Sequence, residues 1–184
     1  MGKVYEALTP ELIEFIQAQQ MFFVGSAPLS ADGHVNLSPK GMDSLRVIDS
    51  LTLAYLDLTG SGAETIAHVR ENGRLVMLFC AFEGSPLLLR VHGNAEVIFA
   101  QDPQFLQWRA RFPEQVGVRS IIKLSATRIA DSCGWTVPEY QQVGNRDYYN
   151  KYAEHKGVEG IRKSQLASNM QSIDQLPALT TPSC

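Results

Sequence analysis

The sequence predicts a mainly β protein in which an antiparallel sheet closes, or nearly closes, into a barrel with helices at its edges. First, about six or seven short segments carry apolar residues that alternate or run together, as in half-buried and buried strands. Second, turn-forming pairs and triplets such as Asp32-Gly33 and Gly84 to Pro86 join these segments in hairpin order. Third, 184 residues with 45% apolar and 19% charged side chains indicate one globular domain with a full core.

The first expected element is a helix that begins at Pro10, where Thr9 can cap free N–H groups and Glu11 favours the positive helix end. The expected strands cover residues 21–27, 34–38, 45–48, 51–58, 74–82, 87–99 and 120–129. Within 87–99, Gly93 indicates a bulge or a bend at a barrel corner. Further helices are expected over 63–72, 102–112 and 145–155, the last ending at Gly157, then a helical stretch to about 171 and a tail over 176–184.

Residues 51–74 read as a buried strand, a turn rich in glycine and hydroxyl residues, and a short helix that stops at Gly73. This arrangement aims free N–H groups and the positive end of the helix toward one point, which suits an anion. We expect hydroxyls of Thr59, Ser61 and Thr65 to donate to phosphate oxygens, and Gly62 to allow close approach and a positive φ.

A turn of this kind is also typical of an ordinary helix start, so the pattern alone leaves both interpretations open. The loop has no lysine, which excludes a Walker phosphate loop. Glu64 and Thr65 stand where the dinucleotide fingerprint needs a third small residue, and the helix is short for a parallel crossover. If the loop binds phosphate, it does so on another scaffold.

Charge and composition narrow the classes of partner. A net charge of −3 without a basic block gives no reason to expect nucleic acid. Three cysteines and four histidines lie apart, without the spacing of a disulfide framework or a metal site. No secretory leader or membrane span is apparent, so we expect a cytoplasmic protein without a membrane partner.

Four segments in order, 34–41, 55–65, 71–79 and 89–96, resemble the flavin-binding split-barrel proteins related to pyridoxamine 5′-phosphate oxidase. The similarity spans about residues 9–130, and segments 132–138 and 172–177 resemble an uncharacterised branch of that family. The resemblance implies a six-stranded antiparallel split β-barrel in a single domain, with a helical extension over about 131–184. It also implies a homodimer that binds FMN in two equivalent clefts between its subunits.

Carried over position by position, residues 36–41 match the family strand that runs along the flavin, and 60–65 match its phosphate segment. Trp135 could stack on the ring or anchor its loop, and Lys40 or Arg90 could reach a phosphate oxygen. The candidate cofactor-binding residues are Asn36, Ser38, Lys40, Gly41, Asp57, Thr59, Gly60, Ser61, Gly62, Ala63, Thr65, Arg90 and Trp135.

The sequence departs from the oxidase in two places. The oxidase has an Arg-Lys pair where this chain has Glu64 and Thr65, and its C-terminal substrate segment with Arg and His has no counterpart here. Vitamin B6 oxidation is therefore not expected. The hypotheses are an FMN-dependent oxidoreductase acting on a small molecule, and a flavin-binding carrier or sensor without turnover, with a haem- or deazaflavin-handling relative as a variant. No catalytic side chain is assigned, because a flavin performs the redox chemistry itself.

Overall fold

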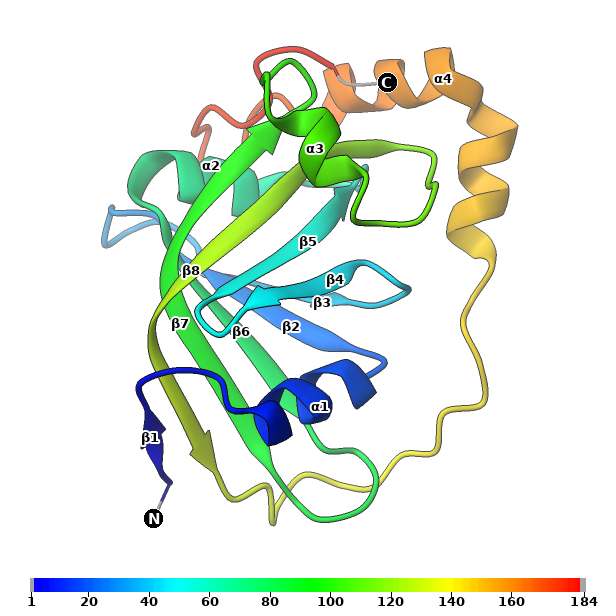
Figure 1. Ribbon diagram of the computed structural model, residues 1–184. Helices are drawn as coiled ribbons and strands as arrows, with labels where there is room; N and C mark the ends of the chain where they lie inside the picture. Colours follow the sequence, from blue (N-terminus) through cyan, green and yellow to red (C-terminus); the bar gives the residue numbers. More distant parts are fainter. Residues whose placement is uncertain (1, 183–184) are drawn as a thin grey trace.

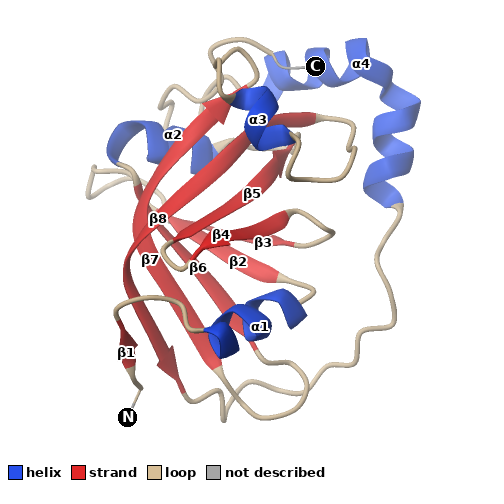
Figure 2. Cartoon of the chain, viewed as in Figure 1, coloured by secondary structure: helices blue, strands red, loops and turns tan. Residues whose placement is uncertain are grey.

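The computed structural model describes residues 2–182, which form one antiparallel sheet curled into an open barrel with four helices around it (Figure 1, Figure 2). The strand order is β3-β2-β6-β7-β8-β5-β4, and β1 pairs with β8. The strands are β1 (Val4–Tyr5), β2 (Phe22–Ser26), β3 (Asn36–Lys40), β4 (Leu45–Asp49), β5 (Thr52–Leu58), β6 (Arg74–Cys80), β7 (Leu88–Phe99) and β8 (Val118–Ser132). The helices are α1 (Pro10–Ala18), α2 (Glu64–Asn72), α3 (Phe105–Arg109) and α4 (Tyr148–Ser168).

The predicted fold class and all seven predicted strands are confirmed. The sheet has eight strands because the short β1, which carries no strand pattern of its own, pairs with the end of β8. The predicted irregularity at Gly93 is confirmed by a register shift between His92 and Gly93. A Cβ on Gly93 would lie 2.0 Å from the Ser125 carbonyl oxygen, so β7 and β8 approach more closely there than a side chain allows.

The barrel is split between β3 and β4, which are the two outer strands of the sheet order. The core side chains come from alternating positions of the strands, as in β2, where Phe22 and Val24 are buried. Thr9 caps α1 by accepting from the Leu12 N–H, as predicted, and α1 buries Leu12 and Ile16 against the core. Figure 1 shows α1 at one end of the barrel and α2 and α3 at the other.

The C-terminal part agrees with the expectation at Gly157 and differs from it after α4. The predicted break at Gly157 is confirmed by its left-handed φ of 59° inside α4. The predicted tail is wrong for 176–179, because Ala178 and Leu179 are buried in the main core, and residues 183–184 lie outside the described range. The Arg70 guanidinium donates to the Ala178 carbonyl, which ties this segment to α2. The predicted helix over 102–112 is a helix only over Phe105–Arg109.

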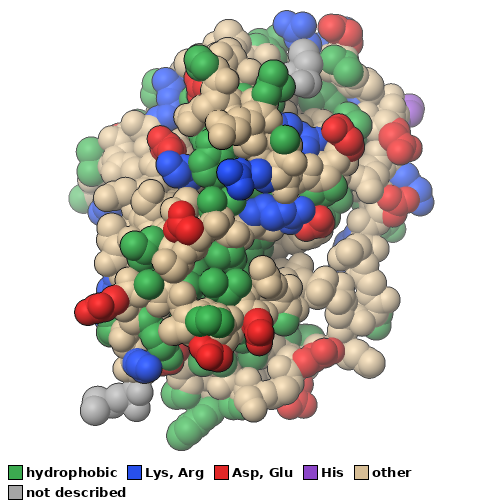
Figure 3. All heavy atoms as spheres, in the orientation of Figure 1, with side chains coloured by type: hydrophobic (Ala, Val, Ile, Leu, Met, Phe, Trp, Pro, Cys, Tyr) green, Lys and Arg blue, Asp and Glu red, His purple; other side chains and the backbone are tan. Residues whose placement is uncertain are grey.

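The segment joining β8 to α4 contacts the β6–β7 connection, where the Tyr140 N–H donates to the Phe82 carbonyl, and Figure 3 shows a gap between this side of the molecule and the barrel. A cavity of about 530 Å³ opens beneath it, lined on the barrel side by residues that include Gln17, Met42 and Arg46 and on the other side by Asn145. Within the described chain, no helix is both long and apolar enough to cross a membrane.

Candidate cofactor site

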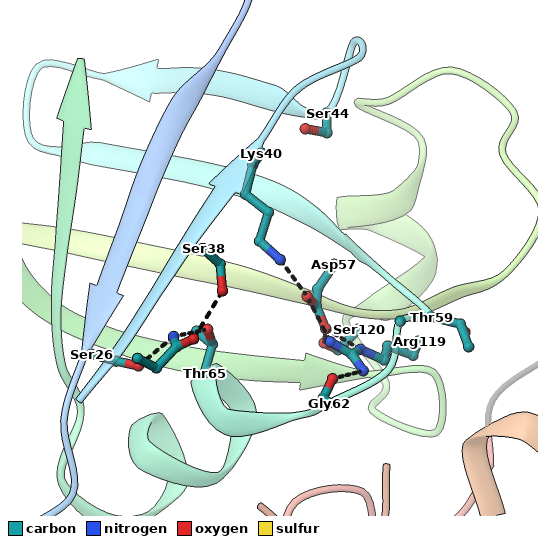
Figure 4. Close-up of polar contacts among 12 residues, drawn as sticks. Ser26, Ser38, Lys40, Ser44, Asp57, Thr59, Gly62, Thr65, Arg119 and Ser120 are labelled. Atoms are coloured by element: carbon teal, nitrogen blue, oxygen red, sulfur yellow. Dashed lines mark hydrogen bonds and ion pairs between the residues drawn. The ribbon is translucent and has the colours of Figure 1, made fainter. Parts of the chain in front are cut away.

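Three polar side chains of β3 form a row that faces the interior of the barrel. Asn36, Ser38 and Lys40 alternate along the strand and therefore share one face. Asn36 and Lys40 pair across the ladder with Ser26 and Phe22, which are both buried. Because paired residues point to the same side of a sheet, the row lies on the inner face, and Figure 4 shows the Lys40 side chain directed toward Asp57.

Asn36 joins three elements through its amide. Its Nδ2 donates to the Ser26 Oγ at 3.1 Å and to the Thr65 Oγ1 at 3.0 Å, and its Oδ1 accepts from the Ser38 hydroxyl at 2.9 Å. Ser26 lies on β2 and Thr65 in the first turn of α2. The sequence-predicted residues Asn36, Ser38 and Thr65 are thus brought together (Figure 4).

Three buried polar atoms have no hydrogen-bond partner among residues 2–182: the Tyr55 hydroxyl, the His68 Nε2 and the Asn169 Oδ1. The other ring nitrogen of His68, Nδ1, lies 3.0 Å from the Ser26 hydroxyl. Which of the two atoms donates in this hydrogen bond depends on the tautomer of His68. Burial lowers the pKa of His68, and burial together with the Asp57 charge raises that of Tyr55.

A buried ion pair lies beside the row. The Asp57 carboxylate, fully buried on β5, accepts from the Arg119 guanidinium and from the Ser120 hydroxyl, and the Lys40 ammonium stands 3.8 Å away. Burial opposes ionisation of Asp57, but the Arg119 and Lys40 charges outweigh it and hold its pKa below the usual value. Arg119 also donates to the Gly62 carbonyl at 2.6 Å and so holds the glycine-rich loop.

The N-terminus of α2 lacks a side-chain cap. Its N-cap is Ala63, which makes no side-chain cap hydrogen bond, so the first N–H groups of the helix have no intrahelical acceptor. Ser61 is exposed beside it. The Glu64 carboxylate folds back over Gly62, where an added Cβ would lie 2.3 Å from Oε2. Gly62 has no left-handed φ, so the expectation of a positive φ there is wrong.

Thr59 and Gly60 are engaged on the interior side of the loop. The Thr59 hydroxyl donates to the Gly117 carbonyl at 2.9 Å and accepts from the Gln165 amide at 2.8 Å. The Gly60 carbonyl accepts from Asn169 at 2.9 Å. The Thr59 hydroxyl is therefore directed into the protein and not toward the free N–H groups of α2, contrary to the expectation for its side chain.

Arg90 and Trp135 lie elsewhere in the chain. Arg90, on β7, donates to Ser132 at 2.9 Å, and Trp135 is exposed just beyond β8. The loop lies near the opposite ends of these strands, where Phe99 pairs with Ser120. Gly41 directly follows β3 and the polar row. It lies close to the backbone of Gln20, two residues after the end of α1.

Sequence reasoning missed Arg119, Gln165 and Asn169. Among the described residues there is no group of three or more His, Cys, Asp or Glu side chains that could hold a metal ion. Cys80 and Cys133 are free thiols, and Cys184 lies outside the described residues.

Comparisons with known proteins agree with this architecture. A family model described as pyridoxamine 5′-phosphate oxidase matches residues 8–133. The chain is similar to the pyridoxamine 5′-phosphate oxidase family protein ustO of Aspergillus flavus, with 35% identity over 192 residues, 95% of this chain and 77% of that protein.

Solved structures show the same fold. HupZ of Group A Streptococcus matches with a TM-score of 0.51 and 25% identity over 66% of this chain and 90% of that chain. A protein described as the FAD binding protein of Mycobacterium smegmatis matches with a TM-score of 0.50 and 12% identity, over 68% of this chain and 96% of that chain. The predicted family is confirmed: the chain belongs to the pyridoxamine 5′-phosphate oxidase family.

Proposed function

We propose that this protein binds FMN, with the phosphate at the N-terminus of α2 and the flavin ring along β3, and uses it as an oxidoreductase acting on a small molecule. The observation that carries the proposal is that the polar row of Asn36, Ser38 and Lys40 adjoins the N-terminus of α2, which has no side-chain cap and where Asn36 donates to Thr65. The family membership and the name of the mycobacterial structural neighbour, an FAD binding protein, support a flavin.

The residues present fit such a cofactor. Free N–H groups of α2 and the exposed Ser61 hydroxyl offer donors for a phosphate, and Lys40 supplies a positive charge 3.8 Å from Asp57. The buried, unpaired Tyr55 hydroxyl adds a polar group beside the row. Glu64 is the unfavourable neighbour, and its half-buried, flexible side chain has to turn away from Gly62 before a phosphate can bind.

A bound flavin supplies the electron-transfer chemistry, so the chain has to bind, orient and shield it. Asn36 is fixed by three hydrogen bonds and holds the row in one orientation. Lys40, held by Asp57 and lying over the Tyr55 ring, keeps a cation on the face of the row.

We also propose a twofold homodimer with the cofactor between its subunits. The edge strand β3 exposes Leu37, and Val35 just before it is exposed as well, although both are large apolar side chains. They line a groove of about 570 Å³ that continues over β2 and β6 and includes Asn36. An exposed apolar edge beside the polar row suits a second copy of the chain. A monomeric mass by light scattering at micromolar concentration contradicts this assembly.

A flavin-binding module without turnover is the second candidate. It is favoured by the ion pairing within the site, since Asp57 engages both Arg119 and Lys40 and none of these three charged groups is without an ion-pair partner. Absorption spectra during titration with FMN, riboflavin and FAD test flavin binding, and equal affinity for FMN and riboflavin contradicts the phosphate site. Anaerobic addition of NADH or NADPH then separates the candidates, because bleaching of the bound flavin supports an oxidoreductase and a spectrum unchanged by both supports the module.

A further inference from the structure

We propose that Gln165 and Asn169 are positioning residues that hold the phosphate loop of this family's barrel in its binding conformation. The proposal rests on the proposed function, because it assigns the cofactor phosphate to the loop at residues 59–63. Both residues come from the C-terminal part of the chain, beyond residues 8–133 that the family model matches. Both are fully buried, so they are not solvated surface groups.

Gln165 is hydrogen-bonded to the first residue of the loop, Thr59. Its Nε2 donates to the Thr59 Oγ1 at 2.8 Å, and that hydroxyl donates in turn to the Gly117 carbonyl at 2.9 Å. The Tyr149 hydroxyl donates to the same carbonyl at 3.2 Å. Two points of α4, one on each side of its break, thus converge on Thr59 and Gly117.

Asn169 is hydrogen-bonded to the next residue of the loop, Gly60. Its Nδ2 donates to the Gly60 carbonyl at 2.9 Å, while its own backbone is fixed by hydrogen bonds from the Leu179 N–H and to the Gln165 carbonyl. Leu179 is buried in the main core. The amide of Asn169 is therefore held in place by the barrel core.

The consequence for the loop follows from peptide geometry. In a trans peptide the carbonyl and the following N–H point in opposite directions. Because the Gly60 carbonyl is turned to Asn169, the Ser61 N–H is turned away from it. The Gly62 carbonyl is turned to Arg119 in the same way, so the Ala63 N–H is turned away from that guanidinium. Asn169 thus orients the Ser61 N–H, as Arg119 orients the Ala63 N–H, before any anion arrives, while Gln165 holds Thr59 at the start of the loop. We call Gln165 and Asn169 together the clamp, and ordering the loop in advance lowers the cost of ordering it on binding.

The test uses the full chain and the near-isosteric variants Gln165→Met and Asn169→Leu, each of which removes one donor to the loop. Gln171→Met is the matched control, because Gln171 is exposed. Ile129→Val is the control for general loss of stability, since Ile129 is buried at the far end of β8. Titrations with FMN and with riboflavin are compared, and amide hydrogen exchange of residues 59–66 is measured without flavin.

We expect each donor variant to weaken FMN by about tenfold while leaving riboflavin unchanged, as one lost hydrogen bond to the loop predicts. Exchange at 59–66 should accelerate in both donor variants and in neither control. If Asn169→Leu does not fold, Gln165→Met carries the test, and Thr59→Val removes the same bond from the loop side.

The outcomes separate this inference from the proposed function. A parent protein that binds neither flavin contradicts the proposed function, and the exchange data then still decide whether the clamp orders the loop. If the parent binds FMN and the donor variants keep its ratio of FMN to riboflavin affinity, the positioning role is wrong. Loss of affinity for both flavins to the same extent, matched by Ile129→Val, shows a general stability effect and also overturns the proposal.

Discussion

Glu64 places a negative charge where the proposed phosphate binds, so Glu64→Gln should strengthen FMN binding. The carboxylate lies against Gly62, at the free N–H groups of α2. Two unit charges 4 Å apart repel by about 1 kcal/mol in water and about 4 kcal/mol at an effective dielectric constant near 20. Glu64 is half-buried and can rotate away, so the lower figure applies, about 1 kcal/mol or about fivefold in Kd.

The same substitution should act in the opposite direction on the flavin-free protein. A carboxylate in the first turn stabilises a helix by about 0.3–1 kcal/mol through the helix dipole, and the amide loses this contribution. Denaturant unfolding of the flavin-free chain measures the loss, and fluorescence titration with FMN at low and high salt measures the gain. The gain should shrink at high salt because part of it is screened Coulomb repulsion.

Glu11→Gln is the control, since Glu11 occupies the first turn of α1, outside the polar cluster. It should leave FMN affinity unchanged. If Glu64→Gln binds FMN no more tightly than the parent at low salt, or strengthens riboflavin equally, then no phosphate lies at the N-terminus of α2.

Three further results are expected. Lys40→Met should weaken FMN by about tenfold at low salt and by less at high salt, as titrations at two salt concentrations will show. Arg119→Met should lower the free energy of unfolding by about 3–5 kcal/mol, because Asp57 is left buried with its main partner gone. The control Arg128→Met changes an exposed side chain and should alter this free energy little. Equal urea midpoints for the two variants contradict the prediction. Burial holds the pKa of His68 below 6.5, so as the pH falls the unfolded chain takes up this proton before the folded chain does. The free energy of unfolding should therefore fall as the pH drops below about 6.5. His68→Gln should reduce this pH dependence in denaturant titrations.

The strands could be predicted because their signal is local. Alternating apolar residues and turn pairs occur within single segments, so the seven longer strands and the break at Gly157 followed from the sequence. The two-residue β1 has no room for a pattern and exists only because β8 offers Ala130 and Ile129 as partners. The burial of Ala178 could not be predicted for the same reason. Its segment is held by the hydrogen bond from Arg70 and by packing in the main core, which are both distant in the sequence.

The candidate site was predicted in part for a related reason. Asn36, Ser38 and Lys40 share a face by the period of the strand, so their grouping could be anticipated. Arg119 could have been sought, because a buried Asp57 requires a cation and its neighbouring strand supplies one. Gln165 and Asn169 meet the loop from more than a hundred positions away, and no pattern within either segment indicates that contact.

The irregular segment over 139–147 joins the barrel to α4 and is exposed along its length. The attachment of the C-terminal part is thus an intramolecular association, in which the linker supplies an effective concentration on the order of millimolar for a short flexible connection. Its docked fraction is set by this concentration and by the affinity of the contacts around Ile161, Gln165 and Leu179. A separate peptide spanning residues 148–182 would have to approach millimolar concentration before it displaced the chain's own copy.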